Sequence, residues 1–220
     1  MEKEITIKSI HLDDTLPKVF ENEEIPASQI WRHNVTFSPE TNYVIEAASG
    51  TGKSSLCAYI YGNRRDYCGK ISFDSTDIRS LTPSQWQQIR RNQLAYLPQE
   101  LDLFPELSAL DNIRLKNALT GHVDDEKIHS WLRMLAIDSR ADYPVGRMSI
   151  GQQQRVAIIR SVCQPFSFLI IDEPVSHLDA RNNEVAAEII LSEARRQKAS
   201  IIATSVGNRI GIPVDSLLKL

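Results

Sequence analysis

The sequence lacks the features that mark secreted, membrane-spanning and disulfide-rich proteins. Its three cysteines, Cys57, Cys68 and Cys163, have neither disulfide nor metal-site spacing, which favours a reducing compartment. No apolar run approaches the roughly 20 residues that a membrane-spanning helix needs. The opening residues, MEKEITIKSI, include acidic side chains and no long apolar stretch, so we expect no secretory signal there.

Neither positive nor negative charge predominates, since 25 lysines and arginines nearly balance 28 aspartates and glutamates. The formal net charge of −3 leaves no broad basic field that would hold nucleic acid or an anionic membrane surface. Hydrophobic residues make up 42% and charged residues 24% of the 220 residues, an ordinary globular composition. That length allows one sizeable core, with at most a smaller lobe beside it. We therefore expect a single globular domain in the cytoplasm with no nucleic-acid partner.

Three short apolar runs predict buried parallel strands, at residues 43–45, 168–171 and 200–204. The first run leads through a glycine-containing turn into residues 53–60, which we expect to form a helix. Strands that alternate with helices indicate an α/β sheet with crossover connections.

The middle of the chain, from about residue 101 to residue 160, contains no good strand. Residues 108–113 and 124–128 begin like helices, each with acidic residues in its first turn. Beyond them, apolar residues recur at helical spacing and are typical of a helix core rather than of a cofactor site: Trp131, Leu132, Leu135 and Ala136. We therefore expect a helical lobe inserted into the α/β core.

Residues 47–54, with the sequence AASGTGKS, form a near-complete P-loop. Backbone N–H groups of such a small-residue loop wrap a β-phosphate, and the positive end of the following helix faces the same phosphates. Lys53 would reach the β- and γ-phosphates, and the Ser54 hydroxyl would be a Mg²⁺ ligand. Ala47 stands where the usual pattern has glycine, a mild departure because alanine is small.

Two carboxylates follow the second apolar run, at Asp172 and Glu173. They would emerge at the carboxyl edge of a parallel sheet, where ligands of open α/β sheets bind. Asp172 would hold Mg²⁺ through its water shell, and Glu173 would act as general base on the attacking water. Taken alone, the pair could equally be two solvated acids that end a strand.

Together with four further motifs in order, these residues resemble the ATP-binding cassette superfamily from about residue 43 to residue 220. Leu97-Pro98-Gln99 is similar to the Q-loop and residues 148–155, MSIGQQQR, to the signature motif; Ser176-His177-Leu178-Asp179 is similar to the D-loop, and Thr204-Ser205 falls where the family has Thr-His. The short length and the QQQRVAI run are most similar to the small ATPases of lipoprotein-release and macrolide-export systems.

The resemblance implies an α/β, P-loop NTPase fold: a mostly parallel sheet with flanking helices, an antiparallel β subdomain near the N-terminus and an inserted α-helical lobe. We expect one domain over residues 1–220, with its core at about 1–98 and 161–220 and the helical lobe at about 99–160. The implied function is an ATP-binding and ATP-hydrolysing transporter subunit, peripheral on the inner face of the cell membrane, with ATP and Mg²⁺ as cofactors. Its partners would be a second ABC ATPase subunit, in a homo- or heterodimer, and a separate membrane permease.

The resemblance also implies a role for individual residues. Catalytic residues would be Glu173, Gln99 and Ser205, and the metal ligands Ser54, Gln99 and Asp172. Nucleotide-binding residues would be Ser49, Gly50, Thr51, Gly52, Lys53, Ser54 and Ser55 of one chain, with Ser149, Gly151 and Gln152 of its partner in a head-to-tail dimer. Asp179 would communicate across that dimer, and the helix starting after Gly151 would direct its positive end at the γ-phosphate.

Two departures from the family pattern bear on activity. Ile150 replaces a signature glycine, and a β-branched residue cannot cheaply adopt positive φ or let phosphate come very close, so we expect a weakened clamp. Ser205 replaces the switch histidine and cannot carry a positive charge, so we expect reduced but non-zero hydrolysis. A soluble non-transport ATPase and a degenerate nucleotide-binding subunit remain alternatives.

The sequence leaves two further assignments open. Phe20 and Trp31 are candidates for stacking on the adenine, although ordinary packing is the favoured role for each. A permease helix would dock between the lobes, near residues 99–111. The apolar side chains there would either receive that helix or fill the core of the lobe: Leu101, Leu103, Phe104 and Leu107.

Overall fold

The computed structural model describes residues 5–23, 27–174, 177–207 and 209–220, which form two sheets with helices around them. The larger sheet is parallel in every pairing and carries the predicted strands near residues 43, 168 and 200. Its order is β6 (Leu94–Leu97), β7 (Phe168–Ile171), β8 (Ser200–Ser205), β3 (Asn42–Glu46) and β9 (Ser216–Lys219). The short apolar strands fit this sheet because both of its faces are covered.

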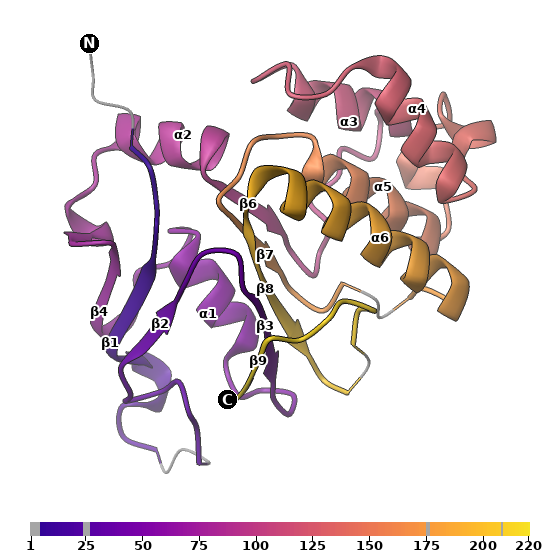
Figure 1. The fold of residues 1–220 in the computed structure, drawn as a ribbon. Coiled ribbons are helices and arrows are strands. Elements are labelled where there is room, and N and C mark those ends of the chain that lie inside the picture. The colour runs from indigo at the N-terminus through magenta and orange to yellow at the C-terminus, as the bar shows by residue number, and fades with distance from the viewer. Residues whose placement is uncertain (1–4, 24–26, 175–176, 208) are drawn as a thin grey trace.

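The smaller sheet is antiparallel and is built mainly from the first third of the chain. A register shift between Asp13 and Leu16 bends β1 where it pairs with β4. In Figure 1 this sheet lies on one side of helix α1, and the parallel sheet lies on the other. The strand order is β2 (Val35–Phe37), β1 (Ile10–Pro17), β4 (Tyr67–Phe73) and β5 (Thr76–Asp77). The expected α/β class with an N-terminal antiparallel subdomain is confirmed.

Most helices begin at a side-chain cap that the sequence carries at the right place. Ser108 and Asp124, the two predicted helix starts of the middle segment, each accept a hydrogen bond from a backbone N–H of the first turn. The helices are α1 (Lys53–Ile60), α2 (Pro83–Asn92), α3 (Ala109–Asn117), α4 (Asp125–Met134), α5 (Ile150–Val162) and α6 (Ala180–Gln197). Short 3₁₀ turns occupy Lys18–Phe20, Ile78–Ser80, Asp138–Arg140 and Val145–Arg147.

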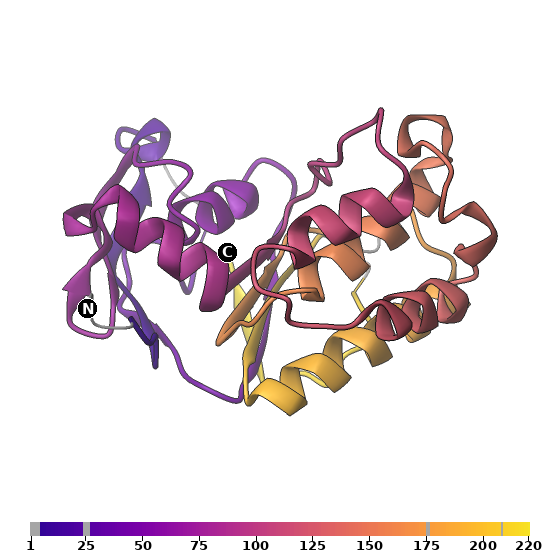
Figure 2. The ribbon, with the colours of Figure 1, turned by 90° about the horizontal axis from the view of Figure 1, so that it is seen from above.

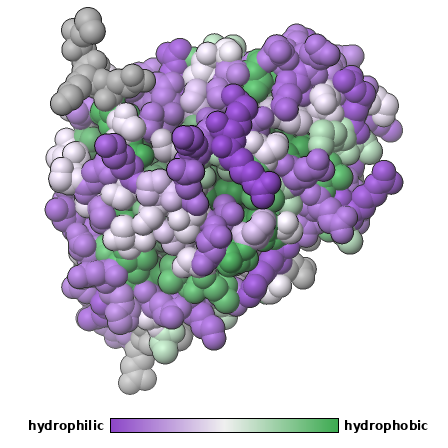
Figure 3. All heavy atoms as spheres, in the orientation of Figure 1, coloured by the Kyte–Doolittle hydropathy of each residue, from purple (hydrophilic) through white to green (hydrophobic). Residues whose placement is uncertain are grey.

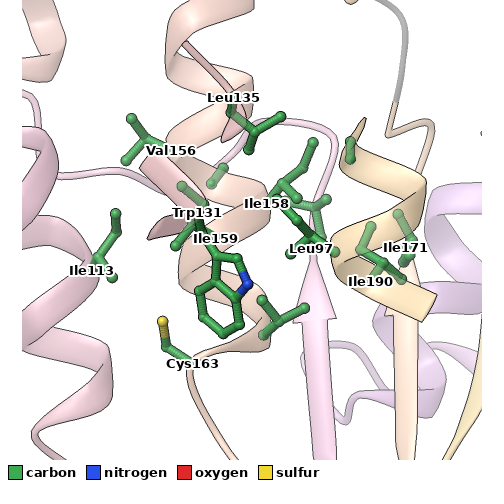
Figure 4. Close-up of a cluster of buried hydrophobic side chains, with 14 of the residues drawn as sticks. Leu97, Ile113, Trp131, Leu135, Val156, Ile158, Ile159, Cys163, Ile171 and Ile190 are labelled. Carbon is green, nitrogen blue, oxygen red and sulfur yellow. The ribbon is translucent and has the colours of Figure 1, made fainter. Parts of the chain in front are cut away.

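Buried side chains of the inserted helices join those on one face of the parallel sheet in a single cluster. Trp131 of α4 lies in this cluster, and burial of one such large side chain stabilises the fold by roughly 1.5–3 kcal/mol. Figure 4 labels the side chains that meet there from α3, α4, α5, α6 and the strands: Leu97, Ile113, Trp131, Leu135, Val156, Ile158, Ile159, Cys163, Ile171 and Ile190. The helical lobe is thus held against the sheet by apolar packing. A second cluster lies between the two sheets, around α1.

Two details of the predicted helices are wrong. Ala136 is exposed and left-handed (φ 52°), because α4 ends at Met134 and the chain reverses there, so it does not belong to the helix core. The signature helix begins at Ile150 rather than after Gly151, because Ser149 caps it. Ile150 therefore has ordinary helical geometry and does not adopt the positive φ that a branched residue reaches only at a cost.

Seen from above, the antiparallel sheet and the helical lobe lie at opposite ends of the molecule, with the parallel sheet between them (Figure 2). On the face drawn in Figure 3, hydrophobic surface is broken into separate areas between hydrophilic side chains. Among the described residues, no helix combines the length and apolarity required to cross a bilayer.

Candidate functional site

The candidate site lies at the carboxyl edge of the parallel sheet, where the loop of residues 47–52 joins β3 to α1. Gly50 (φ 82°) and Gly52 (φ 98°) are both left-handed, a conformation that side chains with a Cβ rarely adopt. Gly52 is also walled in, because a Cβ there would lie 3.1 Å from the Trp31 ring and 3.2 Å from Phe20. The loop backbone can therefore follow a path that exposes successive N–H groups, as an anion-binding nest requires.

Lys53, the first residue of α1, directs its ammonium back into this loop. Its Nζ donates to the carbonyl oxygens of Ala48 (2.8 Å) and Ala47 (3.3 Å), and it lies 3.4 Å from Glu173 Oε1. The side chain is only 4% exposed, so these oxygens rather than water compensate its charge. A buried ammonium at the mouth of a nest suits the binding of a polyanion.

Asp172 and Glu173 leave β7 at the same sheet edge as the loop. Asp172 is buried; its Oδ1 accepts from the Thr204 hydroxyl (2.6 Å), and its Oδ2 has no hydrogen-bond partner among the described residues. Glu173 is left-handed (φ 49°), and its backbone N–H donates to the same Thr204 oxygen (3.1 Å). That turn carries the Glu173 carboxylate back over the loop, beside Lys53.

The residues around this edge fit a magnesium ion bound together with phosphates. Gln99 lies two residues beyond the end of β6. Its Oε1 is 3.4 Å from Ser54 Oγ, so the Q-loop glutamine contacts the P-loop. With the unpaired oxygen of Asp172, the site offers the few oxygen ligands that Mg²⁺ takes when phosphates and water complete its shell. In the described part of the chain, no three histidine, cysteine or carboxylate side chains are grouped to hold a metal by themselves.

The signature residues lie elsewhere, at the start of α5. Ser149 and Gln152 form a capping box, in which the backbone N–H of each donates to the side chain of the other. Ile150 between them is 49% exposed. Gly151 is closely packed, because a Cβ would lie 2.7 Å from the His177 carbonyl. Within one chain, the hydrogen bonds of Ser149 and Gln152 and the packing of Gly151 do not bring these residues into the P-loop site.

Asp179 is the N-cap of α6, where it accepts from the backbone and side chain of Asn182. The backbone hydrogen bond from Asn182 and, next, its side chain hold the pKa of this exposed carboxyl below its usual range. Ser176 of the same motif lies outside the described residues.

Ser205, at the switch position, ends β8 opposite Glu46 and is buried. Its carbonyl accepts from the N–H of Ala47 (3.1 Å), and its hydroxyl accepts from the N–H of Gly207 (3.1 Å). The Ser205 side chain therefore stabilises the turn that follows β8, at the base of the P-loop.

Two residues help to form the site in roles that the sequence did not assign to them. The Thr204 hydroxyl donates to the Asp172 carboxylate and accepts from the Glu173 backbone N–H, whereas the sequence marked Thr204 only by its place in the Thr-Ser pair where the family has Thr-His. Trp31 donates its indole N–H to the Thr51 carbonyl (2.9 Å) and is 2% exposed. As predicted, packing dominates for Trp31; Phe20 is half-buried against the same glycine.

The apolar residues near the expected docking groove divide between two roles. Leu101 is buried in the core of the lobe, and Leu103 packs against that core. Leu107 is half-buried, and only Phe104, 45% exposed, presents a large apolar surface.

Comparisons with known proteins agree with this geometry. The profile of the ABC transporter family matches residues 31–176. The lipoprotein-releasing system ATP-binding protein LolD of Zymomonas mobilis is 32% identical over 160 residues, covering 71% of this chain and 69% of that protein. LolD of Coxiella burnetii is 28% identical over 194 residues, covering 86% and 83%. A dimeric post-hydrolysis structure of the ATP-binding cassette MJ0796 with ADP and Pi superimposes with a TM-score of 0.72 at 25% identity, covering 89% of this chain and 87% of that one.

Proposed function

This chain belongs to the ABC transporter family, and from that membership we propose which of its residues bind ATP, which hydrolyse it and where a permease docks. The protein is an ATP-binding and ATP-hydrolysing subunit of an ABC transporter. The observation that carries the residue assignments is the convergence of Lys53, Glu173 and the loop carbonyls within 3.4 Å at one sheet edge.

The nucleotide phosphates bind to the loop formed by Ser49, Gly50, Thr51 and Gly52 and to the first turn of α1, Lys53, Ser54 and Ser55. Backbone N–H groups and the helix N-terminus supply the donors there. On phosphate binding, the Lys53 ammonium exchanges its carbonyl contacts for phosphate oxygens. It also releases Glu173 from the ion pair, which frees that carboxylate to act as a base.

Glu173 polarises the attacking water and accepts its proton, and Gln99 orients the same water from the neighbouring strand end. Mg²⁺, when bound through Ser54, Gln99 and Asp172, would neutralise charge on the phosphates. Ser205 cannot offer the positive charge of an imidazole and is committed to its own turn, so turnover is slow. This observation favours weak hydrolysis as the second candidate, in which the chain pairs with a more active partner.

Two ATPase subunits close head to tail around the nucleotide. Ser149, Gly151 and Gln152 of one chain face the phosphates held by the other, and Asp179 lies at the same interface. The support is the exposed N-terminus of α5, which directs its positive end outward, and the dimeric state of the MJ0796 structure. The single ABC-type domain spans residues 1–220, with the lobe at about 99–160 between the two parts of the core.

A membrane permease docks in the cleft between α2 and α3. The cleft has a volume of about 470 Å³ and is lined by four cationic side chains and no carboxylate: Arg65, Arg90, Arg91 and Lys116. Pro83 and Leu119, both exposed, provide apolar surface in the same cleft. A cytoplasmic permease helix that carries both acidic and apolar residues matches this lining, which makes the protein peripheral on the inner face of the membrane.

The assignments are tested by the variants Lys53→Ala and Glu173→Gln. We expect Lys53→Ala to weaken MgATP binding at least tenfold, because it removes the buried phosphate-facing charge. We expect Glu173→Gln to bind MgATP normally while kcat falls by roughly 10²- to 10⁴-fold, the range for loss of a general base. Calorimetry measures binding, and phosphate release measures turnover. Equal turnover in the wild type and Glu173→Gln would remove Glu173 from the mechanism.

A further inference from the structure

We infer that Trp31 is a positioning residue for phosphate binding: its indole N–H fixes the peptide between Thr51 and Gly52 and thereby aims the Gly52 N–H at the phosphates. This inference rests on the proposed placement of the phosphates in the loop at residues 49–54. It concerns a residue upstream of the P-loop that the motif itself does not contain.

The contact is a hydrogen bond to the loop backbone. Trp31 Nε1 donates to the Thr51 carbonyl oxygen at 2.9 Å, and both groups are shielded, since Trp31 is 2% exposed. A peptide unit is planar and trans, so its C=O and N–H point in opposite directions. Anchoring the Thr51 carbonyl to the indole on one side therefore holds the Gly52 N–H toward the other side.

The same indole also sets the path of the loop at Gly52. A Cβ on that glycine would lie 3.1 Å from the Trp31 six-membered ring, and Phe20 closes the other side at 3.2 Å. Gly52 is left-handed at φ 98°, so its backbone has few conformations that keep this contact. The wall and the hydrogen bond together restrict the one residue that joins the loop to α1.

Trp31 can act in this way because hydrogen bonds fix the backbone of its own segment, residues 28–32. The Ser28 hydroxyl accepts from the N–H groups of Ile30 (3.0 Å) and Trp31 (2.8 Å). The next residue, Arg32, donates its N–H to the Thr15 carbonyl of β1 (3.0 Å). Gln29 exchanges two hydrogen bonds with Lys219 of β9, each 2.8 Å. The turn at residues 28–32 thus anchors the indole to both sheets.

A stacking role on the adenine does not fit this geometry. The Trp31 ring is buried, and the part of it nearest the loop packs against Gly52. A base needs an open aromatic face, and a side chain that is 2% exposed does not offer one.

The protein contains a matched control in Trp86. This side chain is buried like Trp31, but its indole N–H has no hydrogen-bond partner among the described residues, and it packs on Phe73 away from the P-loop. Replacing either tryptophan by phenylalanine keeps an aromatic ring. Only at position 31 does the change remove a hydrogen bond to the phosphate loop.

The experiment compares Trp31→Phe and Trp86→Phe in the purified full chain. We expect Trp31→Phe to weaken MgADP binding and raise KM for ATP about five- to tenfold, the effect of one lost buried hydrogen bond. We expect kcat to stay within about twofold, because the residues around the γ-phosphate are untouched, and we expect Trp86→Phe to leave both KM and kcat unchanged. Calorimetry with MgADP and steady-state phosphate release provide the two readouts.

An isosteric replacement keeps the test decisive if Trp31→Phe fails to fold. Benzothienylalanine at position 31 retains the shape of the ring system and lacks the N–H donor, and the same residue at position 86 is its control. Nucleotide affinity equal in the two substituted proteins, with Lys53→Ala still impaired, would overturn the role of Trp31 alone. If Lys53→Ala also binds normally, the placement of the phosphates fails instead.

Discussion

Asp172, which we propose as a Mg²⁺ ligand, has a structural cost. Its carboxylate is buried, one oxygen accepts from Thr204, and the other has no partner among the described residues. Burying a charged oxygen without a hydrogen-bond partner destabilises a fold by up to several kcal/mol. The cost is smaller where neighbouring groups or water can relax around the charge. In the proposed role, a cation bound by that oxygen would offset this cost in the nucleotide-loaded protein.

The variant Asp172→Asn therefore separates stability from function. We expect its nucleotide-free Tm to rise by roughly 2–4 °C, equivalent to about 1 kcal/mol in a chain of this size, because the buried charge is gone. We also expect the Mg²⁺ concentration for half-maximal ATPase activity to rise at least tenfold. Thermal unfolding and a Mg²⁺ titration of phosphate release measure the two effects. The exposed carboxylate variant Glu106→Gln is the control, and an unchanged Mg²⁺ requirement in Asp172→Asn would contradict the ligand assignment.

At the scale of elements, helices α3 and α5 bring two cations together beside the cleft. Lys116 of α3 and Arg160 of α5 line one small cavity together with Tyr61 and Tyr96. Burial, and next the charge of Arg160, lower the pKa of Lys116 from 10.5 to about 8. The Nε of Arg160 is buried without a partner among the described residues. The packing of α3 and α5 thus places two cationic side chains side by side, where the acidic residues of the proposed permease helix would compensate their charge.

The lowered pKa predicts a defined dependence of stability on pH. Between about pH 8 and pH 10.5 the unfolded chain binds more protons at Lys116 than the folded chain, so folding stability from this group rises with pH in that window. We expect Lys116→Met to be more stable than the wild type at pH 7 and the difference to shrink by pH 10. Urea unfolding at both pH values measures it. A stability difference between the wild type and Lys116→Met that stays constant from pH 7 to pH 10 would show that Lys116 is not desolvated, and Lys70→Met, at an exposed lysine, is the control variant.

At the scale of the whole molecule, the P-loop and the signature helix would form opposite sides of the nucleotide site in the head-to-tail dimer that we propose. Within the described chain, Ser149 and Gln152 bond to each other, whereas Lys53 and Glu173 meet across the sheet edge. In that proposed dimer, Ile150, exposed in the first turn of α5, would stand where the partner's phosphates approach. Because its backbone is helical, we expect its cost to be steric bulk at the interface.

Dimerisation should respond to that bulk. In a Glu173→Gln background, which retains ATP, we expect Ile150→Ala to tighten the MgATP-dependent dimer about fivefold, equivalent to about 1 kcal/mol. Leu115→Ala, which trims a side chain of equal exposure (49%) on α3, should leave the dimer unchanged. Analytical ultracentrifugation with MgATP measures the dissociation constants. A dimer of unchanged strength in Ile150→Ala would move the interface away from the start of α5.

The sequence alone determined the α/β class, the strands and helices around the P-loop, and the family, because these depend on local patterns. Apolar runs at residues 43–45 and 168–171 became β3 and β7, and Ser108 and Asp124 became helix caps, since propensity and capping act within a few residues. The motifs likewise identify Lys53 and Glu173, because each is defined by its immediate neighbours in the sequence.

Only the tertiary structure decided which of those residues meet and what supports them. It placed Thr204 under both acidic residues, Trp31 against Thr51 and four cations around one cleft, none of which shares a local pattern. It also placed Ile150 in the first turn of a helix with ordinary helical geometry, which the motif pattern alone did not reveal. The physical reason is that burial, desolvation and hydrogen bonding between distant segments depend on how the elements pack, and neighbouring residues in sequence do not carry that information.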